Sequence, residues 1–192
     1  MVIKSFNHRV KMYKPNFFII TGGPGAGKTT VLQELRARGI VTVAEVGRSI
    51  IREQVACGGD ALPWKNIREY SELMLRHSIR DFENHEKIGE PCFFDRGIPD
   101  VLGYNRLTGL DIRNELRNAV SYYQYNNKVF LFSPWEEIYC IDEERKQSFE
   151  LARKTCEEME RAYKALGYTV ISVPFLPVRE RADYMLDFLQ RG

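Results

Sequence analysis

The chain has 192 residues, of which 44% are hydrophobic and 28% are charged, a composition typical of a folded globular domain rather than of a disordered segment. Its 28 basic and 26 acidic residues give a formal net charge of +2, so the chain lacks the basic excess with which proteins bind nucleic-acid backbones. We therefore expect a single domain over residues 1–192, with residues 1–15 as an N-terminal extension, and a nucleic-acid partner is disfavoured.

The hydrophobic stretches of the chain are short. Phe17–Ile20 and Val129–Phe132 are far shorter than the roughly 20 residues that a membrane-spanning helix requires. Met1–Lys14 is basic but has no long apolar core, so it does not match a secretory signal. We expect no membrane span and a cytoplasmic protein, and the sequence leaves its oligomeric state open.

Short apolar runs alternate along the chain with longer segments of helical periodicity. The runs predicted as strands are Phe17–Thr21, Val41–Ala44, Cys92–Asp95, Val129–Phe132 and Thr169–Val173. Helices are predicted to begin near Lys28, Val46, Asn66, Ile98, Asp111, Lys146 and Val178. Strands that alternate with helices indicate parallel β–α–β units, whose strands are covered on both faces. The predicted class is therefore α/β with a parallel sheet.

A glycine-rich segment follows the first predicted strand and opens the first predicted helix. It matches the pattern GxxxxGK(S/T), and the strand before it and the helix after it are the setting that this motif requires. In such a loop backbone N–H groups point at phosphate oxygens, the lysine reaches the β- and γ-phosphates, and the threonine hydroxyl binds Mg²⁺. The predicted nucleotide-binding residues are Gly22, Gly23, Pro24, Gly25, Ala26, Gly27, Lys28, Thr29 and Thr30.

The rest of the chain narrows the class of P-loop protein. Asn127 and Lys128 begin like the guanine-reading motif of GTPases, but Phe130 stands where that motif has an aspartate. The chain is also too short to add the helical lid domain of ring-forming ATPases. These observations disfavour a signalling GTPase and a ring motor, and they leave a kinase or a simpler ATPase.

Charged residues end the second and third predicted strands, at the edge where a parallel sheet presents its ligand site. Asp95 and Arg96 resemble the third motif of P-loop nucleoside and nucleotide kinases. This resemblance implies that Asp95 serves Mg²⁺ or the acceptor hydroxyl and that Arg96 holds phosphate or acceptor. It makes Glu45 a candidate for hydroxyl recognition or general base, and Arg48 a candidate acceptor contact. The alternative for Asp95 and Arg96 is a solvated ion pair, and for Glu45 it is a charge that favours the start of the next helix. The alternative for Arg48 is an arginine that faces solvent.

Two later segments are candidates for closing the site. Residues 135–147 form a charged stretch that we expect to act as a lid, with Arg145 placing its guanidinium on the transferring phosphoryl group. A solvated helix start is the alternative for Arg145. Pro174, after the fifth predicted strand, is a candidate wall of the base site or an ordinary turn residue. Trp64 and Tyr70 could stack on a base or sugar, although packing in the core is the more common role of such aromatics.

Taken together, several segments resemble the NadR-like AAA-domain family of P-loop proteins, which is related to ribosylnicotinamide kinase. They are Gly22–Thr29, Glu45 with Arg48, Asp95–Gly97 followed by Pro99 and Asp100, Asp142–Arg145, and Tyr163–Pro174. The resemblance implies a three-layer α/β/α sandwich, a five-stranded parallel sheet of order 2-3-1-4-5, ATP and Mg²⁺ as cofactors, and phosphoryl transfer. The expected function is a kinase for a nucleoside- or nucleotide-like small molecule. A regulatory ATPase without such an acceptor is the alternative.

Overall fold

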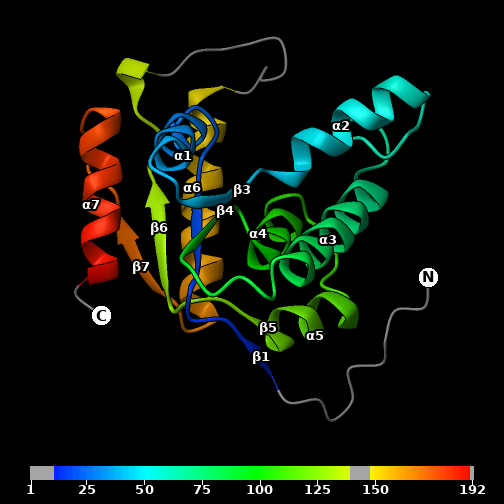
Figure 1. Cartoon of the computed structure of the whole chain (residues 1–192). Coiled ribbons are helices and arrows are strands. Elements are labelled where there is room, and N and C mark those ends of the chain that lie inside the picture. The colour runs from blue at the N-terminus through cyan, green and yellow to red at the C-terminus, as the bar shows by residue number, and fades with distance from the viewer. Residues whose placement is uncertain (1–10, 139–147, 191–192) are drawn as a thin grey trace.

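The five predicted strands form one sheet in a computed structural model, which describes residues 11–138 and 148–190 of the chain (Figure 1). In chain order the elements are β1 (Met12–Tyr13), β2 (Phe17–Gly22), α1 (Lys28–Ala37), β3 (Val41–Val43), α2 (Val46–Cys57), α3 (Ile67–Asn84), β4 (Cys92–Asp95), α4 (Ile98–Leu107), α5 (Asn114–Tyr122), β5 (Tyr123–Gln124), β6 (Lys128–Phe132), a 3₁₀ turn (Glu136–Ile138), α6 (Phe149–Ala165), β7 (Thr169–Ser172) and α7 (Val178–Gln190).

The sheet has the order β3-β4-β2-β6-β7, and all neighbouring strands are parallel. Counted along the chain within this sheet, the order is 2-3-1-4-5, as the resemblance implied. In register, Phe17 of β2 lies opposite Cys92 of β4, and Ile19 lies opposite Val129 of β6. Because the strands are parallel, the carboxyl ends of β2, β3 and β4 meet at one edge, and the loops that follow them share one site.

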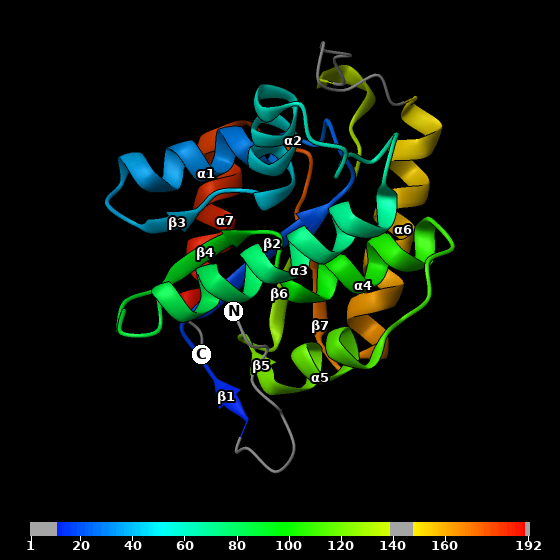
Figure 2. The ribbon, with the colours of Figure 1, turned by 90° about the vertical axis from the view of Figure 1, so that its right-hand side faces the viewer.

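Two hydrophobic cores lie on the two faces of this sheet. Successive side chains of a strand point to opposite faces, and β2 accordingly sends Phe17 and Ile19 into one core and Phe18 and Ile20 into the other. Helices α2 to α6 contribute to the first core, and α1 and α7 contribute to the second. Figures 1 and 2 show α7 and α3 on opposite sides of the sheet, which confirms the predicted three-layer α/β/α class.

Most predicted element boundaries agree with the structure. Helices α1, α2, α4 and α7 begin at the predicted residues, whereas the helix expected near Asp111 begins at Asn114 because Arg113 is extended and acts as its N-cap. The long helix expected from about Lys146 begins at Phe149, where the Ser148 side chain accepts a hydrogen bond from Leu151 N. Serine at this position satisfies one of the free N–H groups of the first turn.

The sequence did not reveal a second, two-stranded sheet, in which Met12 of β1 lies opposite Tyr123 of β5. Tyr123 and Tyr125 are buried in the first core, as is Tyr70. Trp64 is 63% exposed, so the expectation that it packs in the core is wrong. Within the described residues, no helix is both long and apolar enough to cross a membrane.

Candidate active site

The glycine-rich loop leaves the end of β2 and returns the chain into α1. Its first glycine, Gly22, has φ 126°, a conformation that residues with a side chain rarely adopt. A Cβ at this position would lie 2.1 Å from the carbonyl oxygen of Phe132 in β6. Gly27, also at positive φ, caps α1, so the free N–H groups of the first helical turn face the loop. Such a helix start is a ready site for a phosphate group.

Lys28 is the first residue of α1 and is only 5% exposed. Its Nζ donates a hydrogen bond to the carbonyl oxygen of Gly23 at 2.7 Å. Burial, followed by the positive charge of Arg96, lowers the pKa of Lys28, and nearby carboxylates only partly oppose this shift. Among the described residues no carboxylate forms an ion pair with the ammonium group. An anionic ligand on the loop would supply this missing counter-charge.

A cavity of about 380 Å³ opens beside the loop, within the size range of small-molecule sites. Its lining comes from the last six of the predicted loop residues, from Arg48 of α2, from α7 and from the 3₁₀ turn. The lining residues are Gly25, Ala26, Gly27, Lys28, Thr29, Thr30, Arg48, Ile138, Val178 and Arg181.

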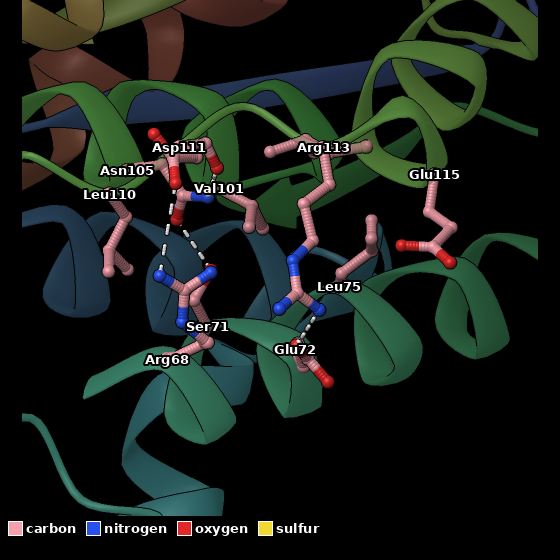
Figure 3. A pocket seen from close by; sticks show the side chains of 11 residues that line it. Arg68, Ser71, Glu72, Leu75, Val101, Asn105, Leu110, Asp111, Arg113 and Glu115 are labelled. Carbon is pink, nitrogen blue, oxygen red and sulfur yellow. Dashed lines mark hydrogen bonds and ion pairs between the residues drawn. The ribbon is translucent and has the colours of Figure 1, made fainter. Parts of the chain in front are cut away.

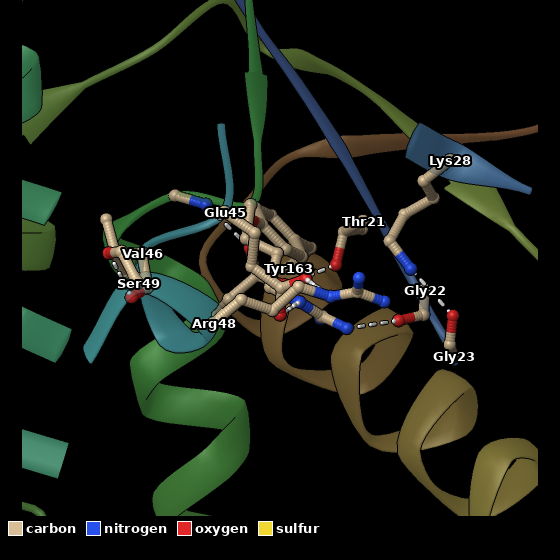
Figure 4. A network of polar contacts seen from close by, with 12 residues as sticks. Thr21, Gly22, Gly23, Lys28, Glu45, Val46, Arg48, Ser49 and Tyr163 are labelled. Carbon is tan, nitrogen blue, oxygen red and sulfur yellow. Dashed lines mark hydrogen bonds and ion pairs between the residues drawn. The ribbon is translucent and has the colours of Figure 1, made fainter. Parts of the chain in front are cut away.

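Arg96 joins the loop to the neighbouring strand ends. Figure 4 shows the polar network around it, to which Gly22, Glu45 and Tyr163 belong. Its Nε donates to Glu45 Oε1 at 3.0 Å, Nη1 donates to Asp100 Oδ1 at 3.0 Å, and Nη2 donates to the carbonyl oxygen of Gly22 at 3.1 Å. Its backbone has φ 68°, unusual for a residue with a side chain and a strain of about 1–3 kcal/mol. The guanidinium is therefore held in one orientation between β2, β3 and β4, and its hydrogen bonds offset the strain.

Asp100, in the first turn of α4, is a buried carboxylate that fixes this arrangement. Its Oδ1 accepts hydrogen bonds from Thr21 and Arg96, and its Oδ2 accepts from Gly97 N and from the hydroxyl of Tyr163 in α6. The sequence predicts no site role for Asp100, Thr21 or Tyr163. The signal was present in part, since Asp100 stands three residues after Gly97, at the spacing with which a carboxylate caps a helix start.

Glu45 and Asp95 differ in their electrostatic environment, although both end strands at the same edge of the sheet. Burial raises the pKa of Glu45, but the charges of Arg96, Lys28 and Arg48 outweigh it and hold the pKa below its usual range. For Asp95, burial and then the charge of Glu45 raise the pKa to about 6. Environments that give two neighbouring carboxyl groups such different pKa values are typical of catalytic sites.

The residues present fit a magnesium ion bound together with a triphosphate. Asp95 Oδ1 is buried and has no hydrogen-bond partner among the described residues, and Thr29 lines the cavity at the start of α1. No three His, Cys, Asp or Glu side chains of the described part of the chain form a metal-binding group. Mg²⁺ needs no such group, because it is usually held by one or two protein oxygens, phosphate oxygens and water.

Arg181 of α7 is a cavity residue to which the sequence analysis gave no role. It is 4% exposed, and its Nη1 donates to the carbonyl oxygen of Ala26 in the loop at 3.2 Å. Its guanidinium carbon lies 5.8 Å from the ring centroid of Phe132 and 5.7 Å from that of Trp135. A helix far along the chain therefore reaches the phosphate loop, which periodicity in the sequence does not reveal.

Some predicted site residues are not brought to the cavity. Neither Glu45 nor Pro174 lines it. The residue after Pro174, Phe175, stacks on Trp135 with a centroid distance of 5.3 Å. Asp95 and Arg96 line a smaller hollow of about 10 Å³ behind the strand ends. Arg145 and residues 139–147 of the expected lid lie outside the described residues.

A separate hollow of about 30 Å³ lies between α3, α4 and α5 (Figure 3). The side chains of Ser71 and Asn105 form a hydrogen bond in it, and Arg113 pairs with Glu72 at 2.5 Å. The hollow has room for about one or two water molecules. It is too small for a nucleoside, so the 380 Å³ cavity is the candidate active site.

Replacing Asp95 with asparagine is expected to stabilise the metal-free protein at pH 7 but not at pH 4. The pKa of Asp95 is about 6 in the folded protein and 3.8 for an ordinary aspartate. The folded state therefore binds this proton more tightly, and the resulting stability is fully present below about pH 4 and is lost as the pH rises through 6. Urea unfolding of both proteins at pH 4 and pH 7 measures the effect.

Asp111→Asn provides the matched control, since the Asp111 side chain is 88% exposed and its replacement should change stability little. A stability change for Asp95→Asn that is the same at pH 4 and pH 7 would contradict the raised pKa.

Comparisons with known proteins show the family and the fold of the chain. A family model described as AAA domain matches residues 17–181. A thymidylate kinase of Chlamydia trachomatis serovar L2 is 30% identical over 130 residues, which is 60% of this chain. The match spans 62% of the length of that kinase.

Two solved structures share the fold. A deoxyadenosine kinase from M. mycoides has a TM-score of 0.64 and 15% identity, covering 92% of this chain and 100% of that one. A NadR protein in complex with NR has a TM-score of 0.63 and 15% identity, covering 91% of this chain and 50% of that one. At these identities the likeness concerns the fold alone. Because the family model extends from β2 into α7, the chain belongs to the AAA-domain family of P-loop proteins.

Proposed function

We propose that this protein is a small-molecule kinase, which transfers the γ-phosphoryl group of a nucleoside triphosphate to a hydroxyl group of a nucleoside- or nucleotide-like acceptor. The observation that carries the proposal is the position of Arg96, which links the phosphate loop at Gly22 to the carboxylate of Glu45. One site thus combines a triphosphate cradle with a hydroxyl-binding group. We also propose that residues 1–192 act as one cytoplasmic domain.

The donor nucleotide would bind through the loop N–H groups and the Lys28 ammonium, with Thr29 and Asp95 holding Mg²⁺ directly or through water. ATP is the donor that the family resemblance implies. A bound Mg²⁺ would neutralise charge on the β- and γ-phosphates. Lys28, which has no carboxylate partner among the described residues, would stabilise the charge that develops on the transferring group. Arg145 is proposed to add a second cation from residues 135–147.

The acceptor hydroxyl would lie against the carboxylates at the strand ends. Glu45 is held by Arg96 at 3.0 Å and by Arg48 at 3.8 Å, which fixes its orientation and keeps it ionised at neutral pH. We propose that Glu45 accepts the hydroxyl proton while Asp95 serves Mg²⁺. In phosphoryl transfer the base mainly orients the nucleophile, so a low pKa of Glu45 is compatible with this role.

The proposal is tested by a transfer assay. The protein is incubated with Mg²⁺ and γ-³²P-labelled ATP or GTP, together with a panel of nucleosides, nucleoside monophosphates and vitamins. We expect label to appear in at least one acceptor. Release of inorganic phosphate at one rate, whatever acceptor is added, would contradict the kinase and favour a regulatory ATPase.

A further inference from the structure

Arg181 is a buried cation without a buried anion. It is 4% exposed, and among the described residues no carboxylate forms an ion pair with it. Burial lowers its pKa, and no acid in the described part of the chain opposes the shift. Its Nε is buried without a hydrogen-bond partner in the described residues. Buried charged groups are normally paired, so this guanidinium, in the wall of the cavity, indicates a ligand that supplies hydrogen-bond acceptors.

The position of Arg181 favours the nucleoside end of that ligand over its phosphates. Its hydrogen bond to the loop goes to the carbonyl oxygen of Ala26, whereas phosphates bind to the N–H groups and to Lys28. The neighbouring lining residues from outside the loop, Ile138 and Val178, are apolar, and Trp135 lies beside the guanidinium. Apolar walls with a few polar groups are typical of sites for flat heterocycles.

The chemistry of a guanidinium makes this contact selective. Arginine has five N–H donors and no acceptor, and the rings of Phe132 and Trp135 flank the guanidinium of Arg181. The edge of that group can therefore donate to a base but cannot accept from it. Guanine and hypoxanthine carry two neighbouring acceptors, O6 and N7, whereas adenine has an amino donor at the same place.

We propose that Arg181 determines the base preference of this cavity and favours 6-oxopurine nucleotides such as GTP and ITP over ATP. The inference rests on the proposed function only in taking a nucleoside triphosphate as the ligand. It differs from the adenine preference that the family resemblance implies, and it does not depend on the guanine-reading motif of GTPases.

Equilibrium binding tests the proposal without an acceptor. Isothermal titration calorimetry of the full chain with Mg²⁺ and GTP, ITP or ATP should give at least about tenfold tighter binding of GTP and ITP than of ATP. Arg181→Met should weaken the binding of GTP and ITP by about tenfold and should change the binding of ATP little. Arg181→Gln, whose amide both donates and accepts, should shift the preference toward ATP. Arg179→Met, an exposed change on the same helix, should leave all three affinities as they are.

Three outcomes would overturn the proposal. The first is that the unchanged protein binds ATP more tightly than GTP and ITP. The second is that Arg181→Met loses affinity equally for all three nucleotides. The third is that this variant loses affinity for inorganic tripolyphosphate by as large a factor. The second indicates that Arg181 only supports the loop, and the third that it contacts phosphate. If neither variant folds, the preference of the unchanged protein decides. Failure of the kinase proposal would instead appear as nucleotide binding without transfer to any acceptor.

Discussion

Replacing Lys28 with alanine is expected to lower phosphoryl transfer by about 10³-fold while the protein keeps its fold. The ammonium group is buried at the start of α1, and its hydrogen bond goes to a carbonyl of the loop rather than to a carboxylate. It is therefore free to interact with phosphate oxygens. Because burial disfavours the charged form of Lys28, its removal should not lower the melting temperature. Steady-state kinetics and circular dichroism measure the two effects.

Lys164→Ala is the matched control for this experiment. Lys164 lies in the last turn of α6, where its exposed ammonium pairs with Glu160 at 2.7 Å. This variant should retain full activity. Substantial transfer by Lys28→Ala would contradict the assignment of the loop as the donor site, and so would a lost activity that is accompanied by loss of the circular dichroism spectrum.

Replacing Asp100 with alanine is expected to destabilise the protein by about 3–5 kcal/mol, because it removes one partner of a buried ion pair. The carboxylate accepts from Thr21, Arg96, Gly97 and Tyr163. Its loss leaves a charged group and polar donors without their acceptor in a region closed to water. Chemical and thermal unfolding measure the loss, and about 2–4 °C of melting temperature is expected for each kcal/mol in a chain of this size.

Asp111→Ala is the control, since the carboxylate of Asp111 is 88% exposed and its nearest cation, Arg68, is 3.9 Å away. It should leave the melting temperature unchanged. Asp100→Asn, which keeps an acceptor oxygen for Arg96, should fall between the unchanged protein and Asp100→Ala. Equal stability of Asp100→Ala and the control would show that the four donors find other partners.

Local sequence patterns predicted the elements of the fold because each depends on neighbouring residues. Continuous apolar runs indicated strands that are buried on both faces, and Gly39 and Gly167 end helices with φ 83° and 85° as such glycines commonly do. The glycine-rich segment and its flanks were sufficient to predict the turn into α1. Trp64 was predicted wrongly because it lies in the turn before α3, where helical spacing does not apply.

The sequence by itself determined the α/β class, the phosphate loop from Gly22 to Thr30, and the charged residues at the strand ends. Only the tertiary structure decided which of these groups are partners. The Arg96–Glu45 pair joins residues 51 positions apart, Tyr163 and Asp100 are 63 apart, and Arg181 reaches Ala26 across 155 positions. Periodicity and spacing describe at most one helix or strand, whereas these contacts arise from the order of the strands and the packing of α6 and α7 against them.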